Sequence, residues 1–216
     1  MGKKNREDTY HRKDLKRTLM RAVRAELREY GAAMASLRRI AARAGVSHAA
    51  PYRHFKSKDG LLAALCWEGQ ADFTSRLRKA REGGTSAADR LFRLGTAYLE
   101  FAKSEPEVFQ LMFSETGHRA MGSNSPEDIE SSFADYDSFA VLENAVKECQ
   151  SEGILDPGEN SGALAMMIWS FVHGFAFIQR EGFAENMGGT RGLSGEATER
   201  LVLGVFRGLI LGQKGK

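Results

Sequence analysis

Hydrophobic residues recur every three or four positions along most of the chain, which is the spacing of one face of an α-helix. No stretch alternates apolar and polar residues as a half-buried strand would. Glycine stands where several of these patterns stop, because it readily adopts the left-handed backbone that ends a helix. We therefore predict an all-α protein. The predicted helices cover about residues 12–30, 37–44, 58–82, 87–103, 131–152, 157–178 and 196–211, with a short helix that begins at residue 48 and another that contains residues 108–113.

Residues 36–58 have the pattern of two short helices joined by a turn. Leu37 and Ile40 begin an apolar stripe, Gly45 ends the first helix, and Ser47 can cap a second one. A helix, a glycine turn and a helix make a helix-turn-helix, whose second helix enters the DNA major groove. Pro51 lacks a backbone N–H, so we expect the second helix to start late or to kink there.

The same residues resemble a known family. The runs Ile40-Ala41, Ala44-Gly45-Val46-Ser47, Tyr52-Arg53-His54-Phe55-Lys56-Ser57-Lys58 and Leu61-Leu62 are similar to the DNA-binding signature of TetR-type bacterial transcriptional regulators. Pro51 departs from it, because that position usually holds an aliphatic residue. Farther along, Trp169 followed by His173-Gly174 resembles the subgroup named for Trp, His and Gly. The resemblance implies a homodimer that binds a palindromic operator on double-stranded DNA, by default as a repressor.

Nine residues are candidates for DNA contact, on their position in the helix-turn-helix and on the resemblance. Arg53 can fork onto a guanine edge, and Tyr52 and Lys58 suit phosphates. The alternative for Tyr52 and Phe55 is packing inside the small domain, which we favour for Phe55; for Arg53 and Lys58 it is a solvated face. The candidates are Arg38, Ser47, His48, Ala49, Ala50, Tyr52, Arg53, His54 and Lys58.

Charge divides the chain into a basic beginning and an acidic remainder. Residues 1–58 carry a net charge of +11, and residues 59–216 carry −8. Within residues 36–58 there are six Lys or Arg and no Asp or Glu, a balance that suits a phosphate backbone. We predict a DNA-binding domain over residues 1–57, with residues 1–11 as a disordered arm, and an effector-binding and dimerisation domain over residues 58–216.

The predicted body contains aromatic and sulfur-containing residues that could line a cavity for an effector. Trp169 and His173 are four residues apart and share a helix face, and a buried imidazole needs a polar partner. We expect a small, largely apolar or aromatic effector. The alternative for each residue is plain core packing. The candidates are Phe109, Met112, Phe113, Met166, Trp169, His173 and Phe177.

The last predicted helix has a narrow stripe that contains two glycines. Such a stripe lets another helix come close, and the resemblance implies that this helix takes part in a dimer interface. The alternative is close packing within one protomer. The stripe consists of Ala197, Leu201, Gly204, Gly208 and Leu211.

Signals for catalysis, metals and membranes are weak. We recognise no phosphate-binding loop, nucleophile elbow or zinc-binding helix, and Glu115 and His118 lie in a segment, residues 114–128, that we expect to be a loop. We therefore predict no enzyme activity, cofactor or metal. The apolar run 163–178 is short for a membrane span, and we expect a cytoplasmic protein with reduced Cys66 and Cys149. Two rivals to an effector-controlled repressor remain: a DNA-binding protein whose body only dimerises or recruits a protein, and an enzyme with a vestigial DNA reader.

Overall fold

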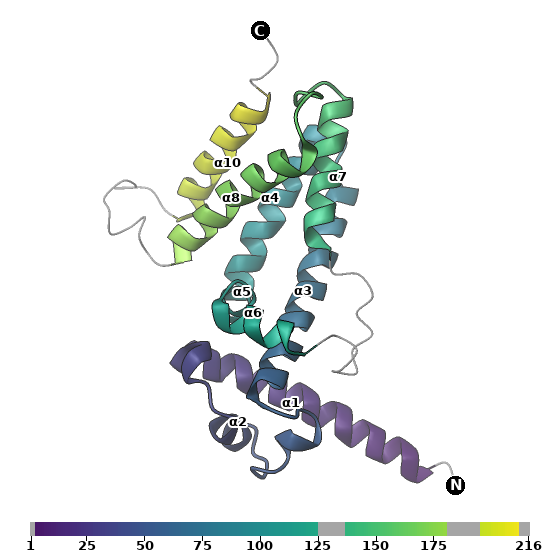
Figure 1. Cartoon of the computed structure of the whole chain (residues 1–216), viewed down its shortest axis with the longest axis vertical. Coiled ribbons are helices and arrows are strands. Elements are labelled where there is room, and N and C mark those ends of the chain that lie inside the picture. The colour runs from purple at the N-terminus through teal and green to yellow at the C-terminus, as the bar shows by residue number, and fades with distance from the viewer. Residues whose placement is uncertain (1–2, 125–136, 181–194, 212–216) are drawn as a thin grey trace. The chain divides into compact units, whose positions relative to one another are not determined.

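The computed structural model describes residues 3–124, 137–180 and 195–211, and its regular elements there are helical (Figure 1). This confirms the predicted all-α class. The helices form two compact units. The N-terminal unit contains residues up to Gln70 together with residues 107–124, and the C-terminal unit contains residues 71–106, 137–180 and 195–211. The predicted domain boundary at residues 57 and 58 instead falls at the start of α3 (Lys58–Glu82), a continuous helix that contributes to both units.

The N-terminal unit is built on α1 (Lys3–Met34), which packs against α2 (Leu37–Arg43) (Figure 1). The unit also holds the beginning of α3, α5 (Pro106–Met112, from its second residue) and α6 (Glu115–Gly122). Gly69 of α3 allows α5 to approach closely, because a Cβ at that position would lie 2.4 Å from Val108 Cγ1. The core of this unit includes Leu19, Val23, Ile40, Leu61, Leu65, Val108 and Phe109.

Helix α1 differs from the prediction at its beginning. It starts at Lys3, whereas we expected residues 1–11 to form a disordered arm and the helix to start at residue 12. No glycine or proline occurs between residues 3 and 30, so nothing in the sequence interrupts a helix there. At its other end the expected break is present: Gly31 has φ 70° and separates the last turn from the rest of the helix.

The second helix of the predicted helix-turn-helix is reduced to one 3₁₀ turn, η1 (Pro51–Arg53). Proline cannot donate to the Ser47 carbonyl, which instead accepts the Ala50 N–H at 2.9 Å. The element therefore begins at proline, as expected for a late start. Its N-cap is Ala50 without a side-chain bond, so the expected cap from Ser47 does not form on η1.

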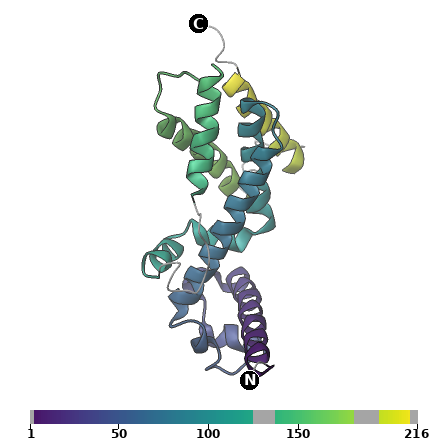
Figure 2. The same cartoon turned by 90° about the vertical axis from the view of Figure 1, so that its right-hand side faces the viewer.

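The C-terminal unit is organised around α4 (Ala87–Ser104), which packs against α7 (Ser138–Ser151), α8 (Ser161–Arg180) and α10 (Gly195–Leu211) (Figure 2). The second half of α3 completes it. The three outer helices can all pack on α4 because buried residues occupy much of its surface. The core of this unit includes Leu91, Leu94, Phe101, Val146, Val172 and Leu203.

Two further segments correct the sequence analysis. Part of the expected loop over residues 114–128 is helix α6, which begins because the Ser114 hydroxyl accepts the Gly117 N–H at 3.0 Å. Helix α8 begins at Ser161 rather than near residue 157, because the Asn160 side chain accepts the Ala163 N–H at 2.9 Å. Residues 131–136 of the predicted helix before α7, and the predicted linker before α10, lie outside the described residues.

Candidate nucleic-acid interface

The turn from residue 47 to residue 53 presents an exposed polar surface on the N-terminal unit. Ser47, His48, Ala49 and Arg53 are exposed, and Tyr52 is 60% exposed, although it is a large aromatic residue. An exposed tyrosine beside an arginine is suited to hydrogen bonding with a phosphate or a base edge. The exposure of Tyr52 argues against its packing role.

Two neighbouring residues of the turn face the core instead. Ala50 is 8% exposed, so Ala49 is the alanine of this pair that can reach a thymine methyl. Phe55 is 3% exposed, which confirms its role in packing. Pro51 of η1 is buried as well, so core contacts at residues 50, 51 and 55 hold the turn while Tyr52 and Arg53 face solvent.

The remaining DNA-contact candidates surround this turn. Arg38 is exposed on α2. His54 is half-buried, with its ring 6.2 Å from that of Phe55. Lys58 is half-buried and its Nζ donates to the Ala33 carbonyl at 3.3 Å. Lys58 therefore stabilises the chain after the α1 break as well as being available to a phosphate.

Sequence reasoning missed a fully buried carboxylate beneath this surface. Glu26 of α1 is 0% exposed and accepts hydrogen bonds from Arg39 Nε at 2.6 Å and from Arg43 Nε at 3.2 Å. It also accepts the backbone N–H of Ser36 at 3.1 Å, at the position before α2 begins. One carboxylate thereby fixes both ends of α2 against α1.

An outer set of contacts holds the same two arginines. The Arg39 guanidinium lies 4.3 Å from the centre of the Tyr30 ring, and its Nη2 donates to the Met34 carbonyl at 2.5 Å. Arg43 donates to Glu29, and hydrogen bonds from Tyr30 and then from Arg43 lower the pKa of the Glu29 carboxyl. Together with Lys58, at least three of the six cations in residues 36–58 are therefore held by contacts within the protein.

In the C-terminal unit, Trp169 and His173 of α8 come together around Tyr98 of α4, which the sequence analysis did not single out. Tyr98 Oη lies 2.6 Å from His173 Nδ1, and Trp169 Nε1 donates to the same hydroxyl at 3.3 Å. Burial lowers the pKa of His173 and raises the pKa of Tyr98. Both groups are therefore neutral near pH 7, and the Tyr98 hydroxyl joins the Trp169 and His173 rings by hydrogen bonds.

The other predicted effector contacts do not gather around this pair. Phe109 and Met112 are buried in the N-terminal unit, where half-buried Phe113 lies with its ring 5.0 Å from that of Phe109. Met166 and Phe177 are exposed on α8 of the C-terminal unit. The seven candidates thus divide between a packed core, a half-buried hydrogen-bonded pair and an exposed apolar surface.

The predicted glycine stripe lies on the exposed side of α10. Leu201 is 58% exposed, and Gly204 and Gly208 have no neighbouring atom within 4 Å of a Cβ built on them. Ala197 is half-buried, and the side chain of Leu211 lies outside the described residues. The opposite side of α10 is buried through Leu203 and Phe206.

Helix α8 continues the exposed apolar surface. Its large exposed residues include Met167, Phe171 and Ile178, and the Phe171 ring stacks on that of Phe206 at 5.3 Å. By length and composition alone, α8 would be apolar enough to cross a membrane. Among the residues that the structure describes, no group of three or more His, Cys, Asp or Glu could hold a metal ion.

Comparison with known proteins identifies both parts of the sequence. Residues 19–65 match the model of the family described as bacterial regulatory proteins, tetR family, and residues 91–202 match that of the Tetracyclin repressor-like, C-terminal domain. The nucleoid occlusion factor SlmA of Pasteurella multocida is 34% identical over 83 residues, which are 38% of this chain and 40% of that protein. The chain thus matches less than half the length of this curated relative.

Solved structures match over nearly the whole chain. A bacterial regulatory protein in the tetR family from Rhodococcus RHA1 is 22% identical with a TM-score of 0.66, over 93% of this chain and 97% of that one. AibR, solved with isovaleryl coenzyme A and operator DNA, is 16% identical with a TM-score of 0.61, over 90% and 97%. At these identities the likeness shows the fold.

The buried carboxylate gives a test of how the interface is held. We expect Glu26→Gln to lower the free energy of unfolding by about 2 kcal/mol, because it leaves part-buried donors without a charged acceptor. It should also steepen the dependence of DNA affinity on salt, because Arg39 and Arg43 become free to contact phosphates. Thermal melting and fluorescence anisotropy at several salt concentrations measure both effects.

Glu29→Gln is the matched control, since Glu29 contacts the same Arg43 from an exposed position. It should leave the melting temperature nearly unchanged. If Glu26→Gln melts like Glu29→Gln, the buried carboxylate does not hold α2 in place.

Proposed function

Because the chain belongs to the TetR family of DNA-binding transcriptional regulators, we propose that it acts as a homodimeric repressor that a small, largely apolar effector releases from a palindromic operator. The DNA-binding part of this proposal rests on the exposed turn at residues 47–53, which follows α2, the helix that Glu26 holds against α1. A dimer presents two such turns, and each reads one half-site in the major groove.

We propose that Arg53 reads a base and that Tyr52, Arg38 and Lys58 position the turn on the backbone. Arginine is the side chain that most often forks onto guanine. The single 3₁₀ turn is short, so few side chains can reach base edges. Ser47, His48, Ala49 and His54 complete the proposed contact surface at its margin.

We propose that the exposed apolar faces of α8 and α10 form the dimer interface. Both helices leave large apolar side chains in solvent, which a soluble protein rarely does over a contiguous surface. A second copy covers this surface, and the glycines of α10 allow the two backbones to approach. This account explains the apolar character of α8 without a membrane and fits a cytoplasmic protein.

We propose that the effector binds in the C-terminal unit beside Trp169, Tyr98 and His173. Their hydrogen bonds fix a neutral polar group within an otherwise apolar helix pair, which suits a ligand that is held by shape and oriented by one polar contact. The isovaleryl coenzyme A named for AibR makes acyl thioesters a reasonable class to include in a ligand screen. The effector acts by binding more tightly to the conformation that releases DNA.

The DNA-reading proposal is tested by two substitutions. Arg53→Ala should cost about 1–3 kcal/mol of binding free energy at one operator position and relax specificity there. Lys58→Ala should weaken binding to all sequences and lower the salt slope by about one. Anisotropy titrations on the operator and on random duplex, each at two salt concentrations, measure these effects. Unchanged binding in both variants would show that this turn does not contact DNA.

The dimer proposal is tested at Gly208. A leucine side chain meets nothing within 4 Å inside one protomer, so Gly208→Leu should not disturb the monomer fold. It should overfill the interface, and sedimentation should show monomer. Phe113→Leu is a control that changes apolar volume in the N-terminal unit. A Gly208→Leu dimer with wild-type stability would place the interface on another surface.

The effector proposal is tested by the emission of Trp169 in a Trp67→Phe background, which removes the other tryptophan. An apolar ligand should change this emission and raise the melting temperature, and Tyr98→Phe should weaken both effects by removing the polar anchor. A panel of apolar compounds and acyl thioesters provides the ligands. If none stabilises the wild type while His173→Ala lowers its melting temperature by several degrees, these residues serve only as core.

A further inference from the structure

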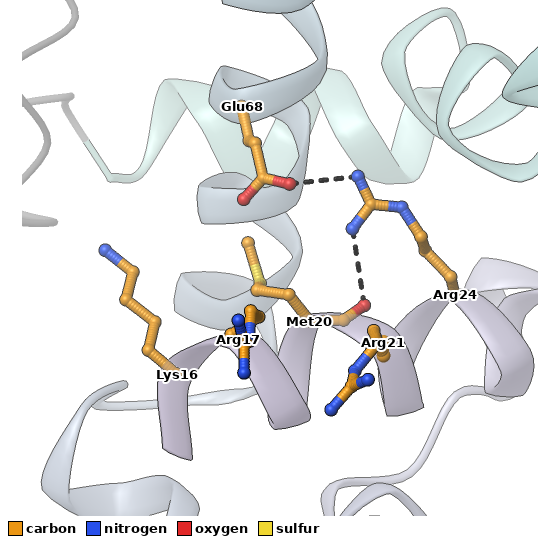
Figure 3. A pocket seen from close by; sticks show the side chains of 6 residues that line it. All are labelled: Lys16, Arg17, Met20, Arg21, Arg24 and Glu68. Atoms are coloured by element: carbon orange, nitrogen blue, oxygen red, sulfur yellow. Dashed lines mark hydrogen bonds and ion pairs between the residues drawn. The ribbon is translucent and has the colours of Figure 1, made fainter. Parts of the chain in front are cut away.

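A buried hydroxyl in the C-terminal unit lacks the partner that such a group requires. Thr74 of α3 is 1% exposed, and its Oγ1 has no hydrogen-bond partner among the residues that the structure describes. A polar side chain that leaves water is normally stabilised by a partner, as Arg24 is by Glu68 at 2.9 Å and by the Met20 carbonyl (Figure 3). Burying a hydroxyl without a partner instead costs free energy. Packing alone therefore does not explain a threonine at this position.

The Thr74 hydroxyl also does not use the acceptor that its own helix offers. A threonine or serine hydroxyl in a helix can donate to the carbonyl three or four residues earlier. Thr96 of α4 donates in this way to the Phe92 carbonyl at 3.3 Å. Ser170 of α8 donates to the Met166 carbonyl at 2.7 Å. Within the described chain Thr74 makes no such bond, so its hydroxyl is available to a bound molecule.

Neighbouring contacts place Thr74 on the inner face of α3. The ring of Phe73, the preceding residue, lies 5.2 Å from the ring of Tyr98 on α4. Arg81 lies within about 20° of Thr74 around the helix, and its guanidinium pairs with Glu148 of α7. The face of α3 that carries Thr74 is therefore turned toward α7, and Thr74 lies at the level of Tyr98.

This position brings Thr74 close to the proposed effector site. The Tyr98 hydroxyl is already hydrogen-bonded to His173 and to Trp169, so these three polar groups satisfy one another. Thr74 has no such arrangement. Resting on the effector function proposed above, we propose that the Thr74 hydroxyl hydrogen-bonds to the polar group of the effector and thereby selects which apolar molecules bind.

The surroundings of Thr74 indicate the chemistry of that polar group. One hydroxyl can satisfy one neutral oxygen, whereas a buried carboxylate needs several charged or polar donors. Arg81, the cation two turns along the same face, is paired with Glu148. The effector is therefore an uncharged, largely apolar molecule with a hydroxyl or carbonyl oxygen.

The burial of Thr74 gives this contact a regulatory consequence. At 1% exposure the hydroxyl is enclosed, so the effector reaches it in a more open packing of the C-terminal unit. The closed packing leaves the hydroxyl without a partner, and the open packing lets the effector supply one. A ligand shifts an equilibrium only through such a difference in contacts between two conformations.

Probe pairs that differ by one oxygen test this assignment: benzyl alcohol with toluene, and cyclohexanone with cyclohexane. Calorimetry measures each probe on the full chain as wild type and as Thr74→Val, which removes the hydroxyl and keeps the shape of the side chain. We expect Thr74→Val to bind the oxygen-bearing probes about tenfold more weakly and the hydrocarbons no more weakly than wild type. Thr74→Ser should restore the preference for oxygen.

The stability of the same variant gives a second readout that needs no probe. Thr74→Val should raise the melting temperature, because it removes a buried hydroxyl without a partner. Thr96→Val is the matched control in the same unit, since the Thr96 hydroxyl has an acceptor on its own helix. It should leave the preference for the oxygen-bearing probes unchanged.

Three results would overturn the assignment. The first is an equal loss of both members of a pair in Thr74→Val, and the second is the same loss of preference in Thr96→Val, since either shows an effect of packing. The third is a lower melting temperature for Thr74→Val, which shows that an ordered water or the backbone already satisfies the hydroxyl. If hydrocarbons still bind the wild type in these cases, the effector proposal stands without Thr74. If no probe of either kind binds, both proposals fail.

Discussion

The pairing of buried Glu26 with Arg39 and Arg43 is the interaction on which the DNA-binding surface depends. A carboxylate without water is costly unless charged donors surround it, and here two guanidinium groups and one backbone N–H supply them. The requirement is directional, so it restricts α2 more tightly than apolar contacts alone would. The exposed turn follows directly after α2, so the contacts that fix α2 also fix where the turn begins.

Pro51 imposes the second constraint on this surface. Without its N–H, the chain tightens into a 3₁₀ turn, and the side chains of residues 48–53 do not follow the spacing of a longer α-helix. Ala50 turns inward while Tyr52 and Arg53 turn outward. A helix-turn-helix described only by its sequence pattern would assign both alanines to the groove. The observed turn leaves Ala49 exposed and uses Ala50 for packing.

The sequence predicted which segments are helical better than it predicted which side chains contact one another. Apolar spacing and glycine stops located α2, α3, α4 and α10 closely, since both signals act within one segment. The α6 helix was missed because its start depends on one serine cap in a polar stretch. Glu26 and Tyr98 were missed for another reason. The spacing of apolar residues predicts which side chains are buried, but it does not predict which other side chains they hydrogen-bond to. A charged or hydroxyl group on a predicted buried face is the available signal, since such a group requires a partner.

The two sides of α1 show why net charge is a poor measure of DNA contact. Residues 1–58 carry +11, and neutralising that many phosphates would give a very steep salt dependence. Arg39 and Arg43 are instead committed to Glu26, Arg24 pairs with Glu68, and Arg28 pairs with Glu107 at 2.5 Å. These arginines stabilise the unit through ion pairs within it. Glu68 and Glu107 lie outside residues 1–58, so the net charge of that segment overstates the charge that the folded unit presents.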